Sequence, residues 1–99
     1  MEIKTNDKEA RMLLDEKIDL SNSHLMKEKF FELLGQEYSN IVLDFTQVKQ
    51  IDSSGLGKIL LFQKELREKN GSLKIVNITS EYVEKMFRMV HLDKVVDIE

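Results

Sequence analysis

Apolar and polar residues alternate near the start of the chain, which predicts short β-strands there. Residues 11–15 form the better candidate, because Ala10, Met12 and Leu14 would all face one side of a sheet. Ile3 stands alone among polar neighbours, as is typical of a short edge strand. The polar residues 6–8 between the two segments favour a turn, so we expect a β-hairpin.

Three later segments have apolar residues at helical spacing. The first follows the polar cluster 21–23, whose short side chains could cap a helix, and is expected to end at Gly35. The second begins around residues 53–57 and stops at the pair 70–71, and the third begins after Ser80. The expected apolar faces are Met26, Phe30, Leu33 and Leu34; then Leu56, Ile59, Leu60, Gln63 and Leu66, widened by Leu61 and Phe62; then Val83, Met86, Phe87 and Val90.

Short apolar runs between these helices predict the remaining strands. Residues 40–45 are almost continuously apolar, as in a strand that is buried on both faces, and the loop 46–52 follows. Residues 73–76 form another run, and residues 95–98 predict a short last strand. The order β-β-α-β-α-β-α-β predicts an α/β fold of one domain, residues 1–99. We expect a mixed, mainly parallel sheet with about three helices packed on it.

The composition is typical of one small soluble globular domain and narrows its function. The 99 residues are 41% hydrophobic and carry a formal charge of −3, which argues against non-specific nucleic-acid binding. The absence of cysteine excludes disulfides, a cysteine nucleophile and thiolate metal sites, and it favours a reducing compartment. The longest apolar run, residues 59–62, is too short for a membrane span or a signal peptide. We therefore expect a cytoplasmic protein that does not insert into membranes.

Few residues are arranged for catalysis or metal binding. His24 and His91 lie far apart in the chain with no second histidine at helical spacing, so no metal site is expected. Three aspartates lie at the end of an apolar segment or directly after one: Asp19, Asp44 and Asp52. In α/β folds, polar residues at the carboxyl ends of strands line the crevice where ligands usually bind. They could equally cap turns and helix starts, and the sequence alone leaves both roles open.

Gly55 and Gly57 are unusual because they lie at the expected start of a helix. A glycine within a helix costs about 1 kcal/mol relative to alanine, so either a partner approaches closely or the helix packs tightly here. Lys58 follows Gly57 directly, which departs from the nucleotide-binding glycine motifs. Ser53 or Ser54 could cap the helix, or expose a hydroxyl whose phosphorylation adds about −1.5 to −2 charges at a favourable helix end.

The run of residues 51–57, with its core Asp-Ser-Ser-Gly-Leu-Gly at positions 52–57, resembles the signature of the STAS domain. The resemblance is to the small stand-alone bacterial anti-sigma factor antagonists, and it extends to residues 18–19, 41–44 and 91–95. Glu16 stands where many members have glycine, which predicts a different bend of the chain or an altered partner surface.

This resemblance implies a regulatory protein with no enzymatic activity and no cofactor. Ser53 is then the phosphorylated residue, and its kinase is an anti-sigma factor with a histidine-kinase-like ATPase fold. The unphosphorylated chain would bind that kinase and free a sigma factor, and a PP2C-type phosphatase would reset the switch. The residues expected to contact the partner are Asp19, Ser21, Asn22, Asp44, Asp52, Ser54, Gly55, Leu56 and Gly57.

Two other functions stay open on the sequence alone. The chain could be a constitutive STAS subunit of a transporter ATPase or of a stressosome-like scaffold. A small-ligand or catalytic site could also be built from Asp19, Asp44 and Asp52. The sequence carries no indication of the oligomeric state.

Overall fold

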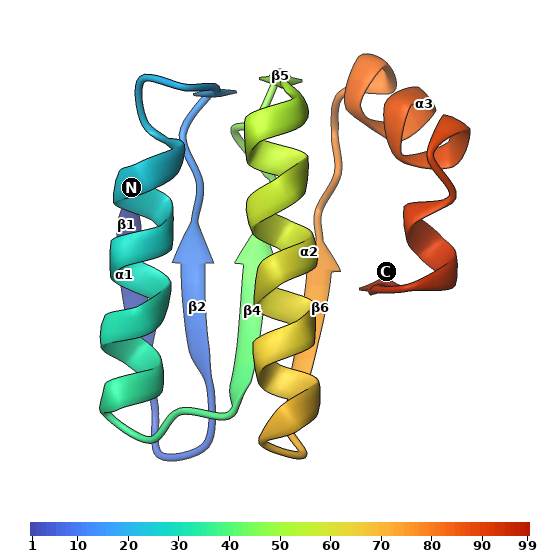
Figure 1. Cartoon of the computed structure of the whole chain (residues 1–99). Coiled ribbons are helices and arrows are strands. Elements are labelled where there is room, and N and C mark those ends of the chain that lie inside the picture. The colour runs from blue at the N-terminus through green and yellow to red at the C-terminus, as the bar shows by residue number, and fades with distance from the viewer.

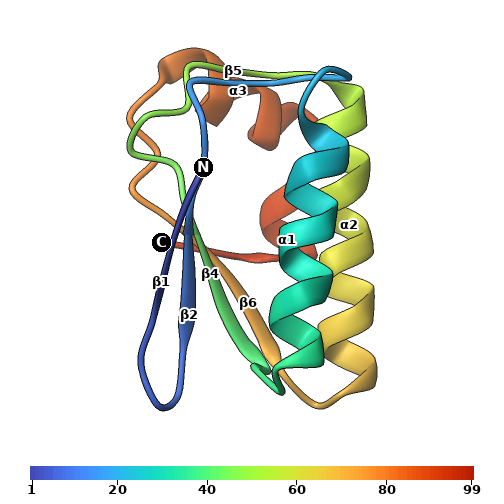
Figure 2. The ribbon, with the colours of Figure 1, turned by 90° about the vertical axis from the view of Figure 1, so that its left-hand side faces the viewer.

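A five-stranded sheet forms one layer of the molecule, and helices α1 and α2 cover one of its faces (Figures 1 and 2). The computed structural model describes residues 1–99. The elements, in chain order, are β1 (Glu2–Thr5), β2 (Ala10–Leu13), β3 (Lys17–Ile18), α1 (Ser23–Gly35), β4 (Asn40–Asp44), β5 (Gln50–Ile51), α2 (Ser53–Glu68), β6 (Ser72–Val76), α3 (Glu81–Met89), the 3₁₀ turn η1 (Leu92–Lys94) and β7 (Asp97–Ile98).

The main sheet has the strand order β1-β2-β4-β6-β7. β1 is antiparallel to β2, and every other pairing in this sheet is parallel. The predicted α/β fold, with a mixed, mainly parallel sheet and three helices, is therefore confirmed. The strands β2, β4 and β6 point toward the end of the molecule where α1 and α2 begin (Figure 1), so the residues expected at strand ends and helix starts lie at one end.

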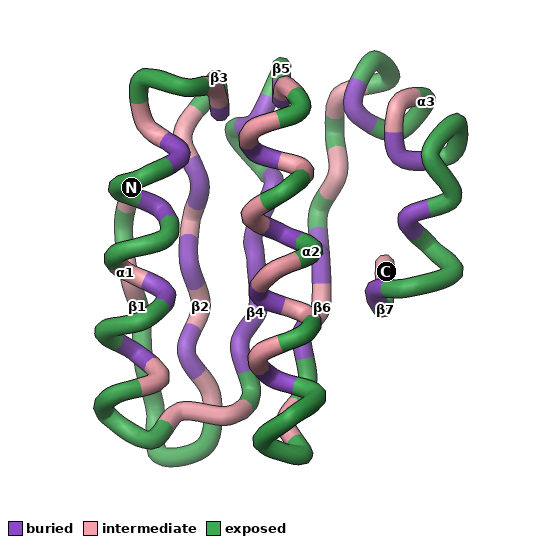
Figure 3. Tube along the Cα trace, viewed as in Figure 1, coloured by how far each residue is buried: buried purple, intermediate pink, exposed green.

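The core fills the space between the sheet and the two helices. Alternate residues of β2 and β4 face this core. The rings of Phe30 in α1 and Phe62 in α2 stack with their centroids 3.9 Å apart. Figure 3 shows the buried positions on the inner sides of both helices and along β4. β4 is buried on both faces as predicted, from Ile41 to Asp44. None of the helices is both long enough and apolar enough to cross a membrane.

The structure corrects the predicted face of α2. Its buried residues are Gly55, Ile59, Phe62 and Leu66, whereas the side chain of Leu60 is 45% exposed. The spacing of large side chains did not indicate that α2 contacts the neighbouring strands through Gly55. In α3, Val83 and Phe87 are buried as predicted, but Val90 is exposed.

The predicted ends of two helices are confirmed, but neither glycine there is the left-handed residue. Gly35 belongs to α1 and is not left-handed; Glu37 takes the left-handed conformation with φ of 71°. After α2 the left-handed residue is Asn70, and Gly71 is required for another reason. A Cβ at Gly71 would collide with the backbone oxygen of Ser39 in the neighbouring connection.

The structure contains elements that the sequence pattern did not predict. β3 and β5 form a separate parallel pair, in which Ile18 lies opposite Ile51. Residues 95–96 are not in a strand, because the turn η1 precedes a last strand of two residues, β7. The pair β3–β5 joins the segments that lead into α1 and α2.

Candidate functional site

The start of α2 is built around the carboxylate of Asp52. Asp52 has an extended backbone and is the N-cap residue, and its Oδ1 accepts the backbone N–H groups of Ser54 at 2.9 Å and Gly55 at 3.1 Å. The hydroxyl of Ser54 donates to the same oxygen at 2.5 Å. The expectation that Ser53 or Ser54 caps the helix is therefore wrong, because the aspartate before them satisfies the free N–H groups.

The two serines that follow Asp52 differ in their surroundings. Ser53 is the first residue of α2 and is exposed, and the hydrogen bonds of this turn leave its hydroxyl free. Ser54 is half-buried and its hydroxyl is bound to Asp52. Only Ser53 therefore offers an accessible oxygen at the positive end of a helix, where added negative charge is favourable.

A second turn, between β3 and α1, brings Asp19 beside this helix start. The Asp52 N–H donates to the carbonyl oxygen of Ile18 at 3.0 Å, so the residue before Asp19 is tied to the cap of α2. Asp19 Oδ1 accepts the N–H and the hydroxyl of Ser21. Asp19 and Asp52 line one shallow depression of about 360 Å³, whose walls are Lys17, Ile18, Asp19, Gln50, Ile51, Asp52 and Tyr82.

Both carboxylates of this depression are held in the charged form. The Ser21 hydroxyl, followed by the Ser21 N–H, lowers the pKa of Asp19 below its ordinary value of 3.8, and the nearby charge of Asp52 opposes this shift. The Ser54 hydroxyl is the main cause of the lowered pKa of Asp52. The site therefore carries two like charges next to Ser53 at neutral pH.

The structure separates Asp44 from this group. Its carboxylate is 7% exposed and binds Arg11 at 3.2 Å, the hydroxyl and N–H of Thr46, and Asn77. Burial raises the pKa of Asp44, but hydrogen bonds led by the Thr46 hydroxyl outweigh it and lower the pKa overall. The expectation that Asp44 contacts the partner is corrected, because the residue is buried and its polar atoms are bound within the fold.

The glycine pair has two different explanations. A Cβ at Gly55 would lie 2.7 Å from side-chain carbons of both Ile18 and Ile51, so this glycine is needed for packing against β3 and β5. A Cβ at Gly57 would meet nothing within 4 Å. Of the two explanations that the sequence leaves open, tight packing applies to Gly55, and Gly57 lies on the open surface. Contact of either glycine with a partner stays a prediction.

Exposed apolar side chains lie close to the two turns. Leu20, next to Asp19, is 71% exposed, Leu56 is half-buried, and Tyr82 of α3 is 58% exposed. Sequence reasoning missed Tyr82, and its only signal is an aromatic residue on the polar side of an amphipathic helix. The surface next to the start of α2 thus combines two carboxylates with exposed apolar groups, a composition suited to contact with another protein.

Other features of the sequence do not add to this site. Glu16 does not have a left-handed backbone, so glutamate fits without strain, and its carbonyl oxygen accepts the N–H groups of Lys49 and Gln50. His24 and His91 are exposed, and no group of three or more histidine, cysteine, aspartate or glutamate side chains could hold a metal ion.

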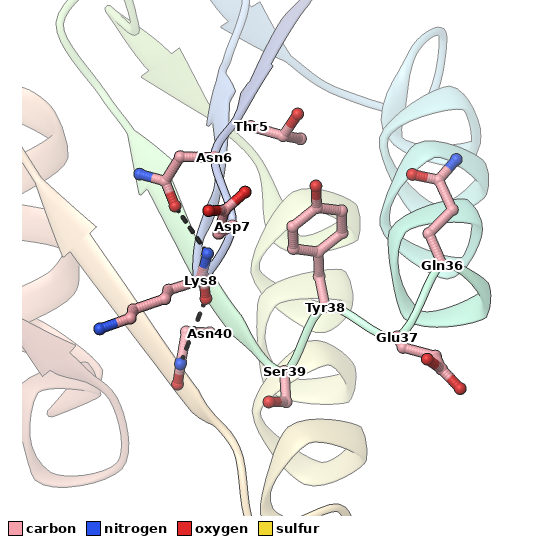
Figure 4. Close-up of a pocket in the computed structure, with 9 residues that line it drawn as sticks. All are labelled: Thr5, Asn6, Asp7, Lys8, Gln36, Glu37, Tyr38, Ser39 and Asn40. Carbon is pink, nitrogen blue, oxygen red and sulfur yellow. Dashed lines mark hydrogen bonds between the residues drawn. The ribbon is translucent and has the colours of Figure 1, made fainter.

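The largest hollow of the surface, about 730 Å³, lies at the opposite end of the sheet (Figure 4). One wall is the turn between β1 and β2, and the other is the connection between α1 and β4. Polar side chains dominate it, and Asn40 Nδ2 bridges the walls by donating to the carbonyl oxygen of Lys8 at 3.3 Å. It shares no residue with the depression beside Ser53.

Comparison with known proteins gives consistent matches along the whole chain. The family model described as the STAS domain matches residues 1–99. A provisionally named anti-sigma factor antagonist of Thermotoga maritima is 31% identical over 88 residues, which cover 88% of this chain and 77% of that protein. The anti-sigma-B factor antagonist of Bacillus subtilis is 26% identical over 98 residues, 99% of this chain and 88% of that protein. The fold also matches phosphorylated SpoIIAA of Bacillus with a TM-score of 0.77 at 20% identity, covering 99% of this chain and 89% of that one.

Proposed function

The chain belongs to the STAS domain family, and we propose that it is an anti-sigma factor antagonist that is switched by phosphorylation of Ser53. In its unphosphorylated form it binds an anti-sigma factor, a serine kinase of the histidine-kinase-like ATPase fold, and so releases a sigma factor. Phosphorylation of Ser53 ends this complex, and a PP2C-type phosphatase restores the binding form. The names of the relatives support the general role.

The difference between Ser53 and Ser54 carries this proposal. Ser53 is exposed at the first position of α2 with a free hydroxyl, whereas the hydroxyl of Ser54 is bound to Asp52. A kinase that docks on this turn reaches the Ser53 oxygen without breaking a hydrogen bond. Ser53 is a substrate residue in this account, because the adjacent carboxylate of Asp52 binds Ser54 and Gly55 and makes no hydrogen bond to the Ser53 hydroxyl.

The electrostatics of the site explain how one phosphate reverses binding. At the N-terminus of α2 the phosphate is favoured by the helix dipole, so the fold itself tolerates it. In a docked interface, however, it adds about −1.5 to −2 charges beside the charged Asp19 and Asp52. Once the partner excludes water from these groups, the phosphate and the two carboxylates repel one another more strongly, which opposes docking. A loss of about 4 kcal/mol would weaken the complex several-hundredfold.

Phosphate transfer to single-serine variants tests the proposal. The purified chain is incubated with ATP and the anti-sigma factor kinase of the same organism, and its intact mass is measured. We expect one phosphate on the wild type and on Ser54→Ala, and none on Ser53→Ala. Phosphate on Ser53→Ala, or none on the wild type, would contradict the proposal. Stoichiometric recovery of a transporter ATPase with the native protein would instead favour a constitutive subunit.

A further inference from the structure

Asn22 occupies the N-cap position of α1 but does not cap the helix. Its carboxamide turns back toward the preceding strand. Oδ1 accepts the backbone N–H of Asp19 at 2.9 Å, and Nδ2 donates to the carbonyl oxygen of Lys17 at 2.6 Å. Asn22 thus links both sides of the turn that carries Asp19, instead of satisfying the first N–H groups of the helix.

From this geometry we propose that Asn22 is a positioning residue for the modification of Ser53, holding the β3–α1 turn in place beside the start of α2. The inference rests on the proposed function. The sequence led us to expect that Asn22 contacts the partner directly. Both polar ends of its carboxamide instead form hydrogen bonds within the turn, so Asn22 affects a partner through the positions of Asp19 and Leu20.

Two further contacts connect the hydrogen bonds of Asn22 to the phosphorylation site. Lys17, the acceptor for Asn22, lies in β3, and β3 pairs with β5 directly before Asp52. The next residue of β3, Ile18, accepts the Asp52 N–H at 3.0 Å. The strand β3, to which Asn22 is hydrogen-bonded, is therefore also hydrogen-bonded to Asp52, the N-cap residue of α2. The β3–α1 turn and the start of α2 are thus connected.

The turn needs such a link because it brings like charges together. Asp19 and Asp52 line the same depression, and no lysine or arginine forms an ion pair with either of them. The hydrogen bonds of Ser21 and the charge of Lys17 lower the pKa of Asp19, and repulsion between the two carboxylates acts against them. Without the bonds of Asn22, this repulsion favours an open turn with Asp19 and the exposed Leu20 displaced.

The test uses a variant that keeps the helix start and removes the link. Asn22→Ser places a favourable N-cap residue before α1, but serine is too short to span the turn. The matched control is Asn40→Ser at the far end of the sheet. Asn40 also bridges two segments, since it donates to the Lys8 carbonyl oxygen (Figure 4). Its Oδ1 also accepts the Ser72 hydroxyl at 2.9 Å.

Two measurements separate positioning from a general structural role. In the free protein, we expect the Asp19 amide to exchange with solvent about tenfold faster in Asn22→Ser than in the wild type or Asn40→Ser. In phosphorylation by the anti-sigma factor kinase of the same organism, we expect the KM for Asn22→Ser to rise about tenfold, with kcat within about twofold of the wild type. The KM of Asn40→Ser should stay at the wild-type value.

Each outcome decides between distinct conclusions. Faster exchange together with the raised KM supports the inference. Unchanged exchange, an unchanged KM, or an equal rise of KM in Asn40→Ser overturns it while the proposed function stands. A wild-type chain that accepts no phosphate overturns the proposed function and the role of Asn22 with it, and the exchange measurement then reports on the turn alone.

Discussion

Ser54 donates both its backbone N–H and its hydroxyl to one carboxylate oxygen of Asp52. This pair leaves the neighbouring Ser53 as the free hydroxyl of the turn. Asp52 consequently has two roles: it caps α2, and it is one of the negative charges that a phosphate on Ser53 would meet. The two roles can be separated by substitution.

Replacing Asp52 should destabilise the fold through loss of the cap. We expect Asp52→Ala to lower the free energy of unfolding by about 1 kcal/mol, because the N–H groups of Ser54 and Gly55 lose their acceptor. For a domain of this size, the melting temperature should fall by about 4–8 °C. Urea unfolding measures the effect. Asp52→Asn is the matched control, since asparagine also caps helices, and an equal loss in both variants would contradict the capping role.

The two glycines of the signature should respond in opposite directions to alanine. Gly55→Ala should destabilise the fold by about 1–3 kcal/mol, because the added Cβ would lie 2.7 Å from carbons of Ile18 and Ile51. Gly57→Ala should stabilise it by about 0.5–1 kcal/mol, because the position is open and alanine favours a helix. Thermal unfolding of the two alanine variants and the wild type measures both changes in stability. Destabilisation by Gly57→Ala would show that its backbone needs glycine.

Acid should weaken the fold through the site carboxylates. The pKa of Asp19 lies below its ordinary value of 3.8, so the folded state binds its proton less readily than the unfolded state. The stability from this group is present above pH 3.8 and is lost as the pH falls through the lower folded value. Ser21→Ala removes the main cause, so the pKa of Asp19 should rise toward 3.8 in an NMR titration. Ser72→Ala, a remote serine, should leave it unchanged; an unmoved pKa in Ser21→Ala would refute the role of Ser21.

The sequence pattern predicts the main sheet and helices well because these elements are long enough to show a period. Residues 41–45 and the face of Met26, Phe30 and Leu33 follow directly from hydrophobicity, and the structure buries them as expected. β3 and β5 have two residues each, which is too short for any periodic signal. They are recognisable only from the pairing of distant segments.

The site was predictable in its residue types but not in its contacts. The signature located Ser53 and Asp52, Asp19 was found from its place after an apolar segment, and the structure brings the two aspartates together. That Asp52 rather than a serine is the cap depends on backbone angles that the spacing does not contain. Tyr82 reaches the depression from α3, some thirty residues further along the chain, and only the packing of that helix places it there.

The central claim is that a phosphate on Ser53 abolishes binding to the anti-sigma factor. Isothermal titration of that anti-sigma factor with the unphosphorylated chain, and then with the chain phosphorylated on Ser53, tests it most directly. We expect an affinity more than about a hundredfold lower for the phosphorylated chain, at unchanged fold and melting temperature. Equal affinities of the two forms would contradict the account.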